Sequence, residues 1–68
     1  MNPETEALRK LIGAFIELRE RAEENRQSCQ RTDNPLGLAY FEDQSDALET
    51  CILHLRKALQ AYPQPQQP

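Results

Sequence analysis

The residues of this chain that could do chemistry are two cysteines, one histidine and a set of carboxylates interleaved with arginines. Cys51 and His54 are three residues apart, so a helix would present both as metal ligands on one face. A zinc site needs about four ligands, and Cys29 falls roughly 20 Å from Cys51 if the chain folds as an antiparallel hairpin. We therefore expect no metal, no cofactor and no intrachain disulfide, with Cys51 a small buried residue and His54 on the surface.

Catalytic machinery is hard to assemble from the remaining residues. The chain has one histidine and no serine or cysteine flanked by a credible base, and its two glycines, Gly13 and Gly37, are too few to make a phosphate-binding loop. The carboxylates fall on helix faces, where solvated charge is the usual meaning. We predict no catalytic residues and no enzyme activity. A ligand-binding or enzymatic dimer, with its site between two hairpins, is the least favoured hypothesis.

Arg19 is a charged residue inside an apolar stripe, one turn beyond Phe15. In the expected hairpin its nearest acids are Asp46 and Glu49, and Arg26 similarly approaches the acidic pair Glu42–Asp43. One interpretation is a charged anchor for a partner. The favoured one is a structural ion pair in which the aliphatic stem of the arginine covers the edge of the core.

Two apolar stripes at helical spacing must position these side chains. The second half of the chain carries a ladder that alternates steps of three and four residues, and the first half carries a wider stripe. The ladder is Leu38, Phe41, Ser45, Leu48, Ile52, Leu55, Leu59 and Tyr62; the stripe is Ala7, Leu8, Leu11, Ile12, Phe15, Ile16, Leu18 and Ala22. Together they predict helices over about 3–28 and 35–62.

Asparagine followed by proline marks the start of each predicted helix. Asn2 and Asn34 are suited to the N-cap, and the prolines that follow them suit the first helical position. A later start for the second helix, near Phe41 or Asp43, is the competing prediction, because Gly37 weakens the first turn.

The short connection between the helices makes them antiparallel neighbours. The fold class is therefore all-α: a two-helix hairpin domain over residues 1–62, followed by a Pro/Gln tail over 63–68 that we expect to be disordered. Apolar side chains concentrate at the open end of this hairpin, whereas the loop end is polar.

A lone hairpin leaves apolar side chains uncovered, and chains this short often need oligomerisation for stability. Ile12, Ile16 and Leu53 are expected to face water in a monomer, so we predict that two hairpins associate as a four-helix bundle. The predicted dimer or partner interface consists of Leu8, Ile12, Phe15, Ile16, Arg19 and Leu53.

The net charge of the chain argues against two classes of function. Eleven acids against eight bases give a net charge of −3, which disfavours direct binding to nucleic acid or to an anionic membrane surface. The N-terminus resembles no signal peptide and no apolar run is long enough to span a membrane, so a cytoplasmic location is the default expectation. We expect a small, non-enzymatic regulatory protein that acts as a homodimer and binds a larger protein. The alternative is a nucleic-acid-associated regulator, acting directly or by acidic mimicry of DNA.

Overall fold

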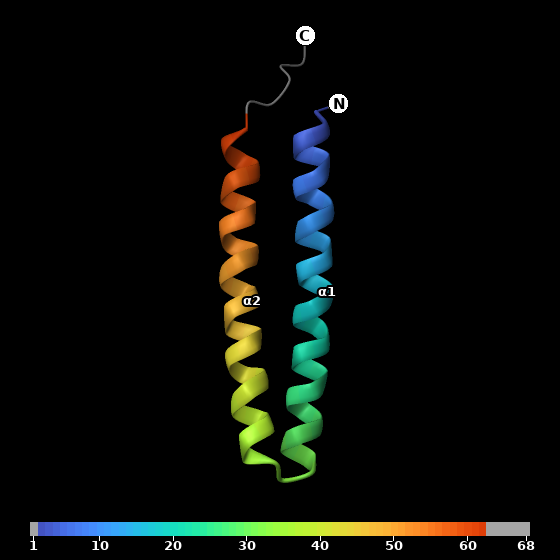
Figure 1. Ribbon diagram of the computed structural model, residues 1–68, viewed down its shortest axis with the longest axis vertical. Coiled ribbons are helices and arrows are strands. Elements are labelled where there is room, and N and C mark those ends of the chain that lie inside the picture. Colours follow the sequence, from blue (N-terminus) through green and yellow to red (C-terminus); the bar gives the residue numbers. More distant parts are fainter. Residues whose placement is uncertain (1, 63–68) are drawn as a thin grey trace.

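A computed structural model describes residues 2–62, which form two helices packed side by side and running in opposite directions (Figure 1). Helix α1 spans Pro3–Arg31 and helix α2 spans Pro35–Ala61. The all-helical antiparallel hairpin is therefore confirmed for this part of the chain. Helix α1 continues three residues past its predicted end at 28, and α2 takes the earlier of its two predicted starts. The predicted tail, residues 63–68, lies outside the described residues.

Both helices begin with the predicted caps. The side-chain oxygen of Asn2 accepts a hydrogen bond from the backbone N–H of Glu4 at 2.9 Å, and that of Asn34 accepts from Gly37 at 3.0 Å. Pro3 and Pro35 each open a helix, where their missing N–H costs nothing. These two signals, local in sequence, set where each helix starts.

Gly37 does not delay the second helix, because its N–H donates to the side chain of Asn34 and completes the cap of a helix that starts at Pro35. A Cβ atom on Gly37 would lie 2.6 Å from the sulfur of Cys29 and 2.8 Å from the side-chain nitrogen of Asn34. Glycine suits this position, because a larger residue would displace the side chains of Cys29 and Asn34 where the end of α1 approaches the first turn of α2. Asp33 has a φ of +56°, a left-handed conformation that aspartate tolerates better than most residues. The N–H of Asn34 then donates to the carbonyl of Cys29 at 2.9 Å and closes the turn.

The seam between the helices follows the predicted ladder on α2. All eight ladder residues, from Leu38 to Tyr62, are buried or half-buried. The facing line on α1 has the same alternation of three and four. It consists of Thr5, Leu8, Ile12, Phe15, Arg19, Ala22, Arg26 and Cys29, all of them buried or half-buried. This strict alternation is typical of helices packed as an antiparallel coiled coil.

The rotation of α1 about its own axis differs in part from the one predicted from the sequence. Ile12, expected to face water, is only 8% exposed, whereas Leu11 and Leu18 are each 43% exposed. The apolar stripe of α1 is wider than the seam, and the line through Leu8, Ile12 and Phe15 enters it. Leu11 and Leu18 therefore lie on the flank of the hairpin.

The seam changes character along its length. At the open end it is apolar, and the phenol of Tyr62 reaches Glu4; the hydrogen bond to that carboxylate and its negative charge raise the pKa of Tyr62 above 10.0. Toward the turn, Arg19, Arg26 and Ser45 occupy seam positions.

Within residues 2–62 no helix is long and apolar enough to span a membrane.

Candidate interaction surfaces

The six predicted interface residues are not all on the surface. Leu8, Phe15, Ile16 and Arg19 are half-buried, Ile12 is buried in the seam, and only Leu53 is well exposed, at 53%. The expectation that Ile12 is left uncovered in the hairpin is therefore wrong. Whether this set takes part in an assembly stays a prediction.

Arg19 makes the predicted ion pair with Glu49. Its Nη1 atom donates to Oε2 of Glu49 at 2.9 Å, and the arginine side chain is 27% exposed against 66% for the glutamate. The arginine stem thus fills a seam position while its charged head reaches the surface. The pair joins α1 to α2 and places Arg19 level with Glu49 along the hairpin.

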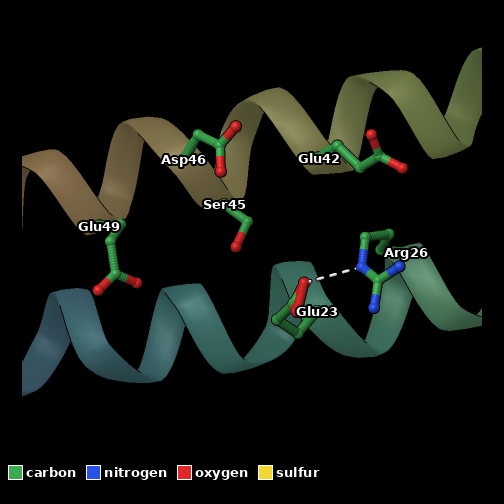
Figure 2. A pocket seen from close by; sticks show the side chains of 6 residues that line it. All are labelled: Glu23, Arg26, Glu42, Ser45, Asp46 and Glu49. Carbon is green, nitrogen blue, oxygen red and sulfur yellow. Dashed lines mark hydrogen bonds and ion pairs between the residues drawn. The ribbon is translucent and has the colours of Figure 1, made fainter.

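Arg26 takes a different partner from the one predicted. Its Nε atom donates to Oε2 of Glu23 at 2.9 Å, one turn earlier on the same helix (Figure 2). The prediction of a pair with Glu42 or Asp43 is corrected, because a neighbour three residues away on α1 is within easier reach. Glu42 nevertheless faces Arg26 across the same groove.

An acidic groove runs between the helices on this side of the hairpin. It is a shallow cavity of about 400 Å³ that both helices line with polar side chains (Figure 2). Its lining residues are Glu23, Arg26, Glu42, Ser45, Asp46 and Glu49. Carboxylates accept hydrogen bonds and attract cations. The groove therefore has the chemistry to hold lysine or arginine side chains of another protein.

The acidic groove belongs to a longer face, which we call the acidic face. Each of its members directly follows a seam residue in the sequence. They are Glu6, Arg9, Gly13, Ile16, Glu20, Glu23, Gln27 and Gln30 of α1, with Ala39, Glu42, Asp46, Glu49, Leu53, Arg56 and Gln60 of α2. Six acids and two bases make this face strongly negative. Its apolar members are Ile16 and Leu53, with the small Ala39.

The opposite flank has almost no charge, and we call it the charge-poor face. A second groove, a cavity of about 260 Å³, opens there between Leu18, Arg21, Ala22, Asn25, Gln44 and Leu48. Helical spacing extends the face along the hairpin. Its members are Glu4, Ala7, Leu11, Ala14, Leu18, Arg21, Asn25 and Ser28 of α1, with Gly37, Tyr40, Gln44, Ala47, Cys51, His54, Ala58 and Ala61 of α2. Only Glu4 and Arg21 carry a formal charge, and α2 contributes none.

The cysteines and the histidine are dispersed over the hairpin. Cys29 is half-buried beside Gly37 at the turn end of the hairpin, and His54 is exposed as predicted. Cys51 is exposed, so the prediction that it is buried is wrong. It directly precedes the seam residue Ile52 in the sequence and lies on the flank of α2. Among residues 2–62, no three His, Cys, Asp or Glu side chains are grouped so that they could hold a metal ion.

The charge-poor face was not predicted, although its signal is present in the sequence. Every charged residue of α2 lies on the acidic face or on the back of that helix. The helical phase of the charged residues carries this signal, whereas the phase of the apolar residues does not. No protein-family model, curated protein or solved structure matches this chain. The candidate function therefore rests on the two faces.

Proposed function

We propose that this chain is a small non-enzymatic interaction protein that works as a homodimer, an antiparallel four-helix bundle of two hairpins, and binds a larger protein. The observation that supports this most is how little the hairpin buries. Within residues 2–62 the buried hydrophobic residues are Ile12, Ala22 and Ile52. The large hydrophobic residues left exposed are Leu11, Leu18, Leu36, Tyr40 and Leu53.

The energetics favour association. Burying one leucine side chain contributes about 1.5–3 kcal/mol, and a domain of this size has a small core from which to offset its loss of conformational entropy. A second hairpin laid on one flank covers several of the exposed side chains at once. It also converts two thin seams into one shared core, which is the arrangement of four-helix bundles.

The partner-binding role is assigned to the acidic face. The acidic groove fits a segment of another protein that carries lysine or arginine, because complementary charge speeds encounter and fixes orientation. Ile16 and Leu53, two residues of the predicted interface, lie on the same face and supply apolar contact beside the charge. Phosphate backbones of nucleic acids are repelled by this face, so the partner we propose is a protein.

Light scattering on the full chain tests the assembly. We expect a mass twice the 7.9 kDa of one chain at micromolar concentration, falling to one chain on dilution. A single-chain mass at all concentrations, together with a cooperative melt, would contradict the homodimer.

Affinity capture from native cells tests the partner. The wild-type chain is compared with a variant that carries Glu42→Lys and Glu49→Lys, which reverses charge in the acidic groove. We expect one stoichiometric protein to be retained by the wild type and lost by the variant, while both have the same mass in solution. Equal retention by both would show that the acidic groove does not bind the partner.

A further inference from the structure

We infer that the second copy packs on the charge-poor face and that the two hairpins point the same way, with both turns at one end of the bundle. In this arrangement α1 of each copy lies against α2 of the other. The inference rests on the homodimer proposed above and adds its face and its direction. It makes the acidic face the outer surface of the bundle on both sides.

Because the charge-poor face carries so few charges, removing water from it costs little free energy. Burying an unpaired charge is far more costly than burying alanine, leucine or cysteine. The acidic face would bury six carboxylates with only two bases on the same face. The charge-poor face would bury Glu4 and Arg21, which lie toward its ends and edge, and a second copy of the same face brings no further excess of charge.

The size of the face matches what a dimer needs. Helix α2 has 27 residues, which at about 1.5 Å per residue makes a face about 40 Å long and, over two helix diameters, about 20 Å wide. The resulting footprint of roughly 800 Å² equals the area that each partner contributes to a standard protein interface.

Over the part of this face away from the turn, the leucines lie on α1 and the smallest side chains lie on α2; the large exposed residue of α2, Tyr40, lies nearer the turn. Helix α1 carries the exposed Leu11 and Leu18, one heptad apart. Helix α2 carries Ala47, Cys51 and Ala58 on the same flank, all of them exposed. One face therefore holds both protruding and recessed positions, which a two-fold dimer requires of a surface that packs on itself.

The register of the hairpin says which of these positions meet. Arg19 is level with Glu49, and Cys29 is level with Gly37. When two hairpins point the same way, levels are preserved, so Leu18 of one copy falls between Ala47 and Cys51 of the other.

By the same count, Leu11 falls between His54 and Ala58 of the second copy. Each leucine thus meets small or medium side chains, and the two α1–α2 contacts between copies are identical by symmetry. Alternation of large and small residues across facing positions is how well-packed bundles fill space.

Hairpins that point in opposite directions would pair α1 with α1 and α2 with α2. The leucines of one α1 would then lie against those of the other α1, and the small residues of one α2 (Ala47, Cys51 and Ala58) would lie against the same set on the other α2. One helix pair would be held apart while the other needed a close approach, and two rigid hairpins cannot satisfy both spacings along one flat face. The same-direction arrangement avoids this mismatch.

Disulfide formation between two differently marked chains tests the arrangement. The first chain carries Leu18→Cys, Cys29→Ser and Cys51→Ser, and the second carries only Cys29→Ser and so retains Cys51. The chains are mixed in equal amounts, their dimeric mass is verified, and they are oxidised. We expect the disulfide to join the first chain to the second, because position 18 of one copy lies beside Cys51 of the other. Two copies of Cys51 are diagonal in the bundle, too far apart for a disulfide.

Each other outcome has a definite meaning. A disulfide between two copies of the second chain would show the opposite direction and overturn the inference while leaving the homodimer intact. A dimeric mass without either disulfide would place the interface on another face, with the same consequence. A single-chain mass for chains that carry only Cys29→Ser would overturn the proposed homodimer itself.

Two controls keep the result independent of the engineered thiol. A first chain with Leu53→Cys in place of Leu18→Cys puts its thiol on the acidic face, and no mixed disulfide is expected. In the second chain alone, alkylation of Cys51 should slow at least about tenfold between dilute monomer and concentrated dimer, because the thiol becomes covered. An alkylation rate that does not depend on protein concentration would contradict the inference even if Leu18→Cys disturbed the packing.

Discussion

The two flanks of this hairpin are made by the same two helices and differ almost only in charge. The acidic face carries eight formal charges on its fifteen positions, whereas the charge-poor face carries two on sixteen. Both have exposed leucines: Leu53 on the first, and Leu11 and Leu18 on the second. The difference shows that exposed apolar residues alone do not mark an interface. What marks an interface is the free energy needed to remove water from the residues around them, which is low where those residues are uncharged.

The seam lies between the two flanks and is part of neither face. It holds the residues that fold the hairpin, so a perturbation there should act before either face matters. The variants below separate the seam from the two faces, and the faces from each other.

Ile52→Ala should have the largest effect. Ile52 is 2% exposed at the centre of the seam, and removing a buried isoleucine side chain costs about 2–5 kcal/mol of folding free energy. The neighbouring change Leu53→Ala, on the acidic face, should cost much less. Thermal and urea melts followed by circular dichroism measure both. Equal destabilisation by the two changes would show that the acidic face, too, is part of the core.

Leu18→Glu should separate the two faces most clearly. The dimer loses two leucine contacts and gains two buried carboxylates, so its dissociation constant should rise at least about 100-fold. Leu53→Glu is the matched control on the acidic face and should change the constant little. Sedimentation equilibrium gives both values. If Leu53→Glu dissociated the dimer and Leu18→Glu did not, the assignment of the faces would be reversed.

Leu11→Ala should have a smaller effect that depends on concentration. In an isolated hairpin Leu11 is 43% exposed, so its loss removes less buried surface than the loss of a core residue would. In the dimer it is covered, and the change should cost about 1–2 kcal/mol for each copy. Melting temperatures measured across the range in which the dimer forms should diverge further from the wild type at the higher concentrations. A constant difference would mean that Leu11 stabilises the hairpin alone.

Glu49→Gln should have the smallest effect. It removes the charge that pairs with Arg19 on the acidic face, and exposed ion pairs are worth less than about 1 kcal/mol. The difference from the wild type should shrink in high salt, because screening weakens the pair in the wild-type chain. The dimer mass should not change. A loss of dimer in this variant would place Glu49 in the interface and contradict the outward position of the acidic face.

Much of the fold was predictable from local signals. The two Asn-Pro pairs mark the helix starts, and the ladder from Leu38 to Tyr62 marks the inner side of α2. The pair between Arg19 and Glu49 also followed from the register. These succeed because a cap involves only neighbouring residues and because a three-four alternation has a single phase on a helix.

The candidate surfaces were predicted less well. Ile12 and Leu11 are adjacent members of one wide apolar stripe, and nothing within α1 alone says which of them turns inward. Arg26 has acidic residues within reach on both helices, and it pairs with Glu23, three residues earlier on its own helix. Cys51 was expected inside, yet a residue next to Ile52 in the sequence lies about 100° away around the helix.

By itself the sequence determined two capped helices, their antiparallel pairing and a segregation of charge by helical phase. Only the tertiary structure decided which line of α1 enters the seam, and therefore that the leucines left outside lie on the charge-poor flank. The physical reason is that helical periodicity defines faces relative to one another but not relative to space. Packing against a second helix sets that rotation, because it buries the line of side chains that fits the partner's ladder.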